Sequence, residues 1–457
     1  MTEPVYDMVI LGAGSGGYAA ALRGAQLGLK VALVEGDKVG GTCLHRGCVP
    51  TKALLHAAET ADAVRAATTL GVKAAFEGID MPAVQAYKDG IISRMYKGLQ
   101  GLVSSRGIDF VQGWGKLVAK DTVEVDGKRY TGKNVVLASG SCSKTIGQEI
   151  SGPVLTSEEA LGLDHVPASA VILGGGVIGV EFASAWASMG CQVTIVEGLP
   201  RLVPNEDEAI SKQLERVFRK RKIAFKTSTM FDHVDRHDGG VTVHTKDGGT
   251  LKAEVLLIAV GRGPVTANLG YEEAGVAMDR GFVLADEYGR TNVEGVWAVG
   301  DIVPGVQLAH RGFAQGIVVA EKIAGLNPTP VDDVLVPKVT FCEPEIASVG
   351  LTEAKAKEVH GAENIATSEF NVAGNAKSQI LGTTGFVKLV SLKDGPIVGF
   401  HAIGARMGEQ VGEGQLMVSW EADANDVASL VHAHPTQNET LGEAAMALAG
   451  KPLHNHG

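Results

Sequence analysis

Two glycine-rich segments of the same design restrict the fold more than any other feature of this sequence. Residues 12–17 read GAGSGG and residues 174–179 read GGGVIG, and each follows a short apolar run that is typical of a buried strand. A stretch with helical character comes next, and then a second apolar run that ends in a glutamate, Glu35 in the first copy and Glu197 in the second. This is the order of a dinucleotide-binding βαβ unit. The sequence therefore predicts an α/β protein with two Rossmann-like domains.

The context of the two segments matters because glycine is abundant, with 60 glycines among 457 residues. At that frequency chance supplies roughly one G-x-G-x-x-G pattern, so an isolated match would carry little weight. Two copies with their strands and helices indicate two bound dinucleotides, and a flavin with a nicotinamide is the obvious pair. A carboxylate such as Glu197 bonds a free ribose 2′-hydroxyl and repels a 2′-phosphate, so NAD is predicted rather than NADP.

A pair of cysteines is the second informative feature. Cys43 and Cys48 lie five positions apart in residues 40–52, which read GGTCLHRGCVPTK. The apolar spacing after Pro50 predicts a helix that begins near this proline, with Cys48 just ahead of its N-terminus, where the helix dipole favours a thiolate. Cysteines five apart on a regular helix are too distant for a disulfide, so the turn between them must be irregular, as Gly47 allows. The pattern indicates a redox-active dithiol.

A structural disulfide and a zinc site are the alternatives for this pair. Closing so short a loop would stabilise the fold by only about 2 kcal/mol, and stable structural disulfides belong to oxidising compartments. A cysteine zinc site needs a second matched pair, whereas Cys142, Cys191 and Cys342 are scattered singly. We therefore predict no metal site.

Charge and hydropathy limit the partners of the chain. The formal net charge of −11 argues against binding to nucleic acid or to an anionic membrane, because both need a clustered positive field. The N-terminus lacks the pattern of a signal peptide, and no apolar run is long enough to span a bilayer. Since a working dithiol needs a reducing compartment, we expect a cytoplasmic enzyme.

The remaining segments are assigned by periodicity. Residues 87–106 are expected to be helical, the short runs over 109–130 to form an antiparallel meander, and residues 134–138 to add a strand to the first sheet. Beyond residue 334, five strand-like runs and helices without a nucleotide motif predict a separate α+β domain. This domain ends in the polar run HAHPTQNE, residues 432–439, in which Glu439 has the spacing of a helix cap.

Taken together, residues 40–52, both glycine segments, residues 291–301 and the terminal polar run make the chain resemble the flavoprotein pyridine nucleotide-disulfide oxidoreductases along essentially its whole length. The resemblance implies NAD-dependent oxidation of dihydrolipoamide on the lipoyl domains of 2-oxoacid dehydrogenase or glycine cleavage complexes, by a homodimer. It also implies an FAD-binding domain (1–148), an NAD-binding domain (149–270), a central segment that completes the FAD site (271–334) and a C-terminal dimerisation domain (335–457).

The resemblance further assigns roles to individual residues. It implies that Cys43, Cys48, His434 and Glu439 are catalytic, with His434 reaching the cysteines of the other subunit. Lys52 is expected to pair with Glu181 beside the flavin. The FAD contacts implied are Gly12, Gly14, Gly17, Glu35, Thr42, Lys52, Ser139, Gly140, Asp301, Ala309 and His310. The NAD contacts implied are Gly174, Gly176, Gly179, Glu181, Glu197 and Gly261.

Two departures from the usual family pattern bear on substrate entry. His45 and Arg46 replace a commoner Asn-Val between the cysteines, and Gln437 and Asn438 precede Glu439 where an apolar residue and a serine are usual. The alternative activity is reduction of a low-molecular-weight disulfide such as that of glutathione or mycothiol. That chemistry is normally driven by NADPH, which Glu197 disfavours. A flavin-bearing scaffold without turnover is a third possibility, and the complete set of cysteines and histidine argues against it.

Overall fold

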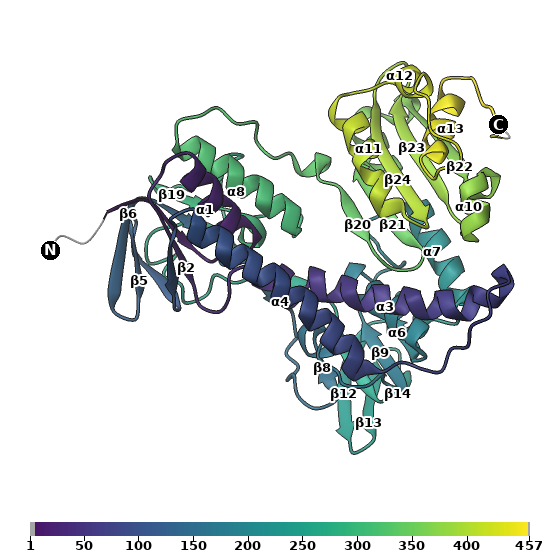
Figure 1. The fold of residues 1–457 in the computed structure, drawn as a ribbon, viewed down its shortest axis with the longest axis horizontal. Coiled ribbons are helices and arrows are strands. Elements are labelled where there is room, and N and C mark those ends of the chain that lie inside the picture. Colours follow the sequence, from purple (N-terminus) through teal and green to yellow (C-terminus); the bar gives the residue numbers. More distant parts are fainter. Residues whose placement is uncertain (1–4, 456–457) are drawn as a thin grey trace.

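Three large β-sheets form the centres of three units in the computed structural model, which describes residues 5–455 (Figure 1). The unit with the N-terminus and the unit with the C-terminus lie at opposite sides of the view, and the second unit lies below them. Two long helices, α3 (Cys48–Ala66) and α4 (Met81–Ser105), pack on each other, and α3 also packs on α6 (Val177–Met189) of the second unit. This architecture confirms the predicted fold class of two Rossmann-like units and a C-terminal α+β domain.

The first sheet has the strand order β3-β2-β1-β6-β5-β4, with β19 paired to the other side of β6. The parallel strands β1, β2 and β19 are nearly continuous apolar runs because helices cover the sheet. Helices α1 (Ser15–Gln26) and α8 (Ala309–Ile323) approach closely, and a Cβ at Gly316 would lie 2.3 Å from the carbonyl oxygen of Gly16. The strands are Tyr6–Leu11 (β1), Val31–Glu35 (β2), Asp109–Gln112 (β3), Gly115–Ala119 (β4), Thr122–Val125 (β5), Lys128–Leu137 (β6) and Val296–Ala298 (β19).

Two strand predictions for this sheet are wrong in detail. The run at 109–111 is β3, which pairs in parallel with β2 rather than joining the meander. The runs at 128–130 and 134–138 are one strand, β6, whose first part pairs antiparallel with β5 and whose second part pairs in parallel with β1. The alternation of residues identifies a strand but does not name its neighbour, so the pairing could not be derived from the pattern.

The second sheet is entirely parallel, in the order β11-β10-β9-β15-β8. A three-stranded antiparallel sheet, β12-β13-β14, packs against it through Val241 and Val243, which contact the apolar cluster around Val171 and Leu256. The strands are Val154–Leu155 (β8), Ser169–Leu173 (β9), Gln192–Val196 (β10), Ala224–Lys226 (β11), Phe231–His237 (β12), Gly240–Thr245 (β13), Thr250–Ala253 (β14) and Val255–Ile258 (β15). Two further helices are Ser157–Ala160 (α5) and Glu208–Lys220 (α7).

The third sheet is antiparallel, in the order β20-β21-β24-β23-β22, and its five strands confirm the five predicted runs. A buried ion pair ties this unit to the second one, because Lys388 Nζ lies 2.8 Å from Asp207 Oδ1. The strands are Lys338–Thr340 (β20), Glu345–Gly350 (β21), Ile365–Asn371 (β22), Phe386–Leu392 (β23) and Ile397–Gly404 (β24). The helices are Glu353–His360 (α9), Ala376–Leu381 (α10), Met407–Ser419 (α11), Ala424–Ala428 (α12) and Glu439–Leu448 (α13).

Short elements connect the three units. Strand β7 (Ser141–Ser143) pairs with β16 (Arg262–Pro264), and β17 (Met278–Asp279) pairs with β18 (Phe282–Val283). Helix α2 (Gly41–His45) precedes α3. The 3-10 turns are Ala67–Leu70, Gly300–Ile302, Asp333–Leu335, Ala362–Asn364 and Val372–Gly374. Among residues 5–455, no helix combines the length and the apolar character needed to cross a membrane.

Candidate active site

The two cysteines lie on two consecutive helices, one short and one long, which are separated by a break in the helical backbone. Cys43 belongs to α2, and Cys48 is the first residue of α3. The turn is therefore irregular, as predicted, but α3 begins at Cys48 rather than near Pro50. A proline in the first helical turn loses no hydrogen bond, because the first four N–H groups of a helix have no internal partner. Cys48 thus lies within the first turn instead of just ahead of it.

The cysteine segment is held against the first glycine segment. The N–H of Gly40 donates to the carbonyl oxygen of Ala13 over 2.8 Å. Gly41 has a positive φ of 58°, and a Cβ there would lie 2.7 Å from the Cα of Gly14. A side chain at position 41 would therefore separate the dithiol from the loop predicted to bind the flavin pyrophosphate.

The two thiols differ in acidity. Interaction with the Cys43 thiol lowers the pKa of Cys48 to about 7, and the positive charge of Lys52 acts in the same direction. The same interaction, together with burial, raises the pKa of Cys43 well above its usual range. Cys48 therefore carries the thiolate of the reduced pair and Cys43 carries the proton, which agrees with the acidity expected for Cys48. The largest cause is the neighbouring thiol rather than the helix dipole invoked from the sequence.

The side chains of His45 and Arg46, which depart from the family pattern, each contact a neighbouring segment of the same chain. His45 Nε2 lies 3.0 Å from the carbonyl oxygen of Val39, and its ring meets the ring of Tyr96 edge-on with centroids 5.1 Å apart. Arg46 Nη2 donates to Asp37 Oδ2 over 2.6 Å. Both side chains thus brace the cysteine turn against neighbouring segments.

Lys52 and Glu181 form the predicted pair. Lys52 Nζ lies 2.9 Å from each carboxylate oxygen of Glu181, whose side chain is 3% exposed. The N–H of Phe341 donates to the same carboxylate over 2.9 Å, and Lys52 Nζ lies 4.7 Å from the centre of the Phe341 ring. This contact joins α3, α6 and the start of the third unit one turn beyond Cys48. Phe341 was not predicted from the sequence, and its place after a strand offered no signal.

The two glycine segments have nearly the same geometry. The first glycines, Gly12 and Gly174, have φ of 104° and 102°. A Cβ on the last glycines, Gly17 and Gly179, would lie 1.8 Å and 1.9 Å from the carbonyl oxygens of those first glycines. These four positions therefore require glycine for the turn and for close packing of helix on strand.

The middle glycines are different, because a Cβ added at Gly14 or Gly176 would meet no atom of the described residues within 4 Å. Each middle glycine lies one residue before the first residue of its helix, α1 or α6, so free N–H groups of the helix face an open approach. A helix N-terminus with accessible backbone favours a phosphate. Both loops therefore fit a dinucleotide pyrophosphate.

The glutamates at the strand ends are oriented in the same way. Glu35 accepts hydrogen bonds from the N–H of Ala13 at 2.7 Å and of Asp37 at 2.8 Å. Glu197 accepts from the N–H of Gly175 at 2.6 Å and of Leu199 at 2.7 Å. Each carboxylate is thereby held beside its glycine loop, with lone pairs left for a ribose hydroxyl.

The other residues predicted to contact FAD lie near the first glycine loop or the end of β6. Asp301 Oδ2 accepts from Ser141 Oγ at 2.5 Å, and Ser139 Oγ donates to the carbonyl oxygen of Val265 at 2.6 Å. Gly140 has a positive φ and open surroundings, and so does Gly261, which is one of the predicted NAD contacts. Ala309 opens α8, while His310 Nε2 lies 2.7 Å from the carbonyl oxygen of Pro337. Thr42 lies on α2 beside Cys43.

His434 and Glu439 form a second, separate cluster in the third unit. His434 Nδ1 lies 2.8 Å from Glu439 Oε1, while Glu439 Oε2 accepts from the N–H of Thr436 at 2.7 Å. Glu439 is the first residue of α13, so one carboxylate both orients the imidazole and binds the preceding turn. The imidazole is 71% exposed, and within residues 5–455 its Nε2 has no hydrogen-bond partner. The structure of one chain therefore does not bring His434 to the cysteines.

A neighbouring histidine–glutamate pair was not predicted from the sequence. His432 Nε2 lies 2.8 Å from Glu413 Oε1, and Asn438 Nδ2 donates to Glu413 Oε2 at 2.6 Å. The hydrogen bond with Glu413 raises the pKa of His432. The polar run at 432–439 was the available signal, but Glu413 lies on α11 and only the fold brings it there.

Comparisons with known proteins identify the family of this chain. Residues 6–316 match the sequence model of the pyridine nucleotide-disulphide oxidoreductases, and residues 336–445 match the dimerisation domain of the same group. The chain therefore belongs to the pyridine nucleotide-disulphide oxidoreductase family, which confirms the resemblance noted in the sequence.

Individual relatives cover nearly the whole chain. A dihydrolipoyl dehydrogenase of Bacillus subtilis is 38% identical over an alignment that covers 98% of this chain and 99% of that protein. The mitochondrial dihydrolipoyl dehydrogenase 2 of Arabidopsis thaliana is 37% identical over 98% of this chain and 91% of its own length. Among solved structures, LpdA from Mycobacterium tuberculosis has a TM-score of 0.90 at 26% identity, covering 96% of this chain and 99% of that chain.

Proposed function

We propose that this protein is a dihydrolipoyl dehydrogenase, which oxidises the dihydrolipoamide of protein lipoyl domains to lipoamide and reduces NAD⁺ to NADH. The observation that carries the proposal is the 37–38% identity to curated dihydrolipoyl dehydrogenases over 98% of the chain. The unequal acidity of Cys43 and Cys48 supports it, because an exchange cycle needs one thiolate and one protonated thiol. In this proposal residues 1–148 and 271–334 hold FAD, residues 149–270 hold NAD and residues 335–457 form the dimer interface.

The first half of the cycle is a thiol–disulfide exchange. His434 Nε2 takes the proton of one dihydrolipoyl thiol, and the resulting thiolate attacks Cys43 Sγ. The bond between the sulfurs of Cys43 and Cys48 breaks, and Cys48 leaves as a thiolate. The second dihydrolipoyl thiol then attacks the mixed disulfide, so that lipoamide is released and Cys43 takes up a proton. Two electrons thereby pass from dihydrolipoamide to the cysteine pair.

The second half of the cycle restores the disulfide. Bound FAD supplies the relay through which the electron pair of the dithiol reaches NAD⁺ as a hydride. Lys52 and Glu181 hold a paired charge close to Cys48, and the ammonium favours the thiolate. The Glu197 carboxylate lies at the end of β10, where it accepts a hydrogen bond from a ribose 2′-hydroxyl and repels a 2′-phosphate.

The exposed imidazole of His434 supports a dimeric site. A base must come within hydrogen-bonding distance of the thiol it deprotonates, and His434 and the cysteines lie in different units of the fold. The third unit also exposes large apolar side chains, with Trp420 at 76% and Val431 at 99%. A second copy of the chain would cover this surface and bring His434 to the opposite dithiol. Because the dithiol must stay reducible, the proposal includes a cytoplasmic location.

A comparison of substrates tests the proposal. The purified flavoprotein is assayed with dihydrolipoamide and NAD⁺, with dihydrolipoamide and NADP⁺, and with glutathione disulfide or mycothiol disulfide and NADPH. We expect turnover in the first assay to exceed the others by orders of magnitude, and the Cys48→Ser variant to be inactive in all of them. Faster reduction of a low-molecular-weight disulfide by NADPH would overturn the proposal in favour of the alternative activity.

A further inference from the structure

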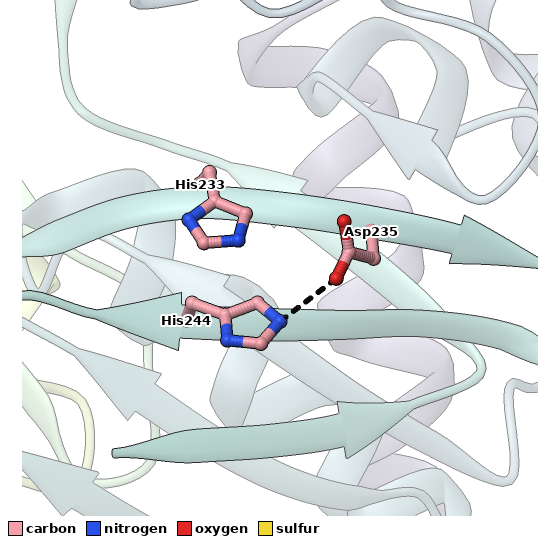
Figure 2. Close-up of side chains that lie close together, drawn as sticks. All are labelled: His233, Asp235 and His244. Atoms are coloured by element: carbon pink, nitrogen blue, oxygen red, sulfur yellow. Dashed lines mark hydrogen bonds and ion pairs between the residues drawn. The ribbon is translucent and has the colours of Figure 1, made fainter. Parts of the chain in front are cut away.

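Two histidines and an aspartate gather on the outer face of the β12-β13-β14 sheet, on the opposite side from its apolar core. His233 and Asp235 are two apart on β12 and therefore share a face of the strand. His244 lies directly opposite His233 on β13. Figure 2 shows the three side chains turned toward one another above the two strands. One potential ligand atom from each residue, an imidazole nitrogen or a carboxylate oxygen, lies within 4.8 Å of those of the other two.

A β-bulge produces this arrangement. The pairing of β12 with β13 shifts between Phe231 and His233, so Asp232 is an extra residue on β12. Phe231 and Val234 can therefore both pack on the apolar cluster although they are three positions apart. The shift leaves His233 and Asp235 on the outer face. Without the bulge, burial of Phe231 would turn His233 toward the core.

The contacts of the two imidazoles suit metal binding. Asp232 Oδ2 lies 2.8 Å from His233 Nδ1, which leaves His233 Nε2 free for another partner. Metal-bound histidines commonly have their second ring nitrogen held by a carboxylate in this way. His244 Nε2 lies 3.0 Å from Asp235 Oδ2, and the two rings are stacked with centroids 4.2 Å apart.

We propose that His233, Asp235 and His244 bind a divalent transition-metal ion of the Zn²⁺ class at the surface of the second unit. Two imidazoles and one carboxylate form a ligand set that such ions favour, and three protein ligands leave a fourth position for water. Cysteine spacing gave no indication of this site, because its ligands come from two strands. The site is distinct from the dithiol and from both dinucleotide loops.

Binding requires only rotation of the side chains. Zinc bonds to nitrogen and oxygen are about 2.0–2.2 Å long, so ligand atoms around a tetrahedral ion are about 3.3 Å apart. The stacked rings must turn so that one nitrogen of each faces the ion. The side chains of His233 and Asp235 are 53% and 65% exposed, and that of His244 is 26% exposed, so no buried group opposes this change. Arg236, the residue after Asp235 on β12, forms an ion pair with Glu149.

Titration of the oxidised, FAD-loaded protein without an affinity tag tests the site. The Cys43–Cys48 disulfide must be formed, because the free thiols would themselves bind the metal. Isothermal titration with ZnCl₂ should give one bound ion per chain, and His244→Ala or Asp235→Asn should weaken this binding at least tenfold. With one equivalent of Cu²⁺, electron paramagnetic resonance should report two nitrogen ligands in the wild type and one in His233→Ala.

His165→Ala is the matched control. His165 is also exposed and lies 2.8 Å from Asp164 and 2.7 Å from Glu254, but among residues 5–455 no second imidazole joins it in a metal-binding group. This variant should bind zinc like the wild type. Flavin content and the rate of NADH oxidation by an electron-accepting dye verify that each variant is folded. Zinc binding that survives His244→Ala, or that is lost equally in His165→Ala, would overturn the assignment, as would the absence of stoichiometric binding to the wild type.

Discussion

Replacing Glu439 with glutamine tests the carboxylate that orients His434. Glu439 uses its two oxygens separately, with Oε1 2.8 Å from His434 Nδ1 and Oε2 2.7 Å from the N–H of Thr436. Burial alone would raise the pKa of this carboxyl, but the hydrogen bonds from Thr436 and His434 lower it overall, so Glu439 is ionised at neutral pH. A glutamine has the same shape but only one accepting oxygen, and its other atom is a donor.

The substitution leaves the amide two orientations, and both impair the site. If its oxygen stays on the Thr436 N–H, the amide nitrogen donates to His434 Nδ1 and forces the ring proton onto Nε2, which then cannot accept a proton. If its oxygen faces Nδ1, two donors meet at Thr436, and the partly buried N–H loses its hydrogen bond at a cost of at most about 1–3 kcal/mol. The first orientation costs less. Since a general base contributes about 10²–10⁴-fold, we expect turnover with dihydrolipoamide and NAD⁺ to fall by that factor.

The assay separates this loss from misfolding. NADH oxidation by an electron-accepting dye does not need His434, so it should be unchanged in Glu439→Gln. Glu413→Gln makes the same exchange beside His432, which carries no proposed proton transfer, and should retain most lipoamide activity. If Glu439→Gln keeps full lipoamide activity, or loses the dye reaction to the same extent, the orienting role of Glu439 is refuted.

Three further predictions concern Cys48, Glu197 and Lys388. In the two-electron-reduced wild type, the thiolate-to-flavin absorption band should grow as pH rises through about 7, because Cys48 loses its proton there. Cys43→Ala cannot form the disulfide, so its Cys48 thiolate lies beside oxidised flavin without added reductant, and its band should appear at higher pH; Cys48→Ser should show no band. Glu197→Arg should raise the ratio of NADP to NAD use, measured as kcat/KM for each, because a repelling carboxylate becomes a phosphate partner. Lys388→Met should destabilise the protein by about 3–5 kcal/mol in thermal or urea unfolding, because it leaves the buried Asp207 carboxylate unpaired.

Each of these outcomes has a contrary result. A band that persists in Cys48→Ser and disappears in Cys43→Ser would reverse the roles of the two cysteines. An unchanged coenzyme ratio in Glu197→Arg would remove this residue from the selection of NAD. Lys212→Met breaks an exposed pair with Glu208 and should cost at most about 0.5 kcal/mol; an equal loss in both lysine variants would contradict the special cost of the buried charge.

The parts of the fold that sequence reasoning predicted well are those in which local chemistry determines the backbone. Gly12 and Gly17 cannot be replaced without a collision between a Cβ and a carbonyl oxygen, so their spacing specifies the turn wherever the flanking strand and helix are present. The pairing of Lys52 with Glu181 came from family resemblance alone, since 129 positions separate them. Residue roles at the flavin and nicotinamide remain predictions.

The errors arise where neighbours, rather than local pattern, decide the structure. The partner of β3 and the continuity of β6 depend on the register of a seven-stranded sheet. The juxtaposition of His233 and His244 depends on one bulged residue, Asp232, which no alternation of apolar and polar residues reveals. The main cause of the acidity of Cys48 is the thiol of Cys43, and this contact appears only once α2 and α3 are placed.

The proposed mechanism depends most on a site shared between two subunits, and co-expression of two inactive variants measures this directly. Cys48→Ser and His434→Ala subunits assemble at random, so half of the dimers are mixed, and each mixed dimer has one site with both an intact dithiol and an intact imidazole. The predicted result is about a quarter of wild-type lipoamide activity per subunit, while each variant alone is inactive. If His434 serves the cysteines of its own chain, no mixed dimer has a complete site, and the absence of any recovered activity would contradict the mechanism.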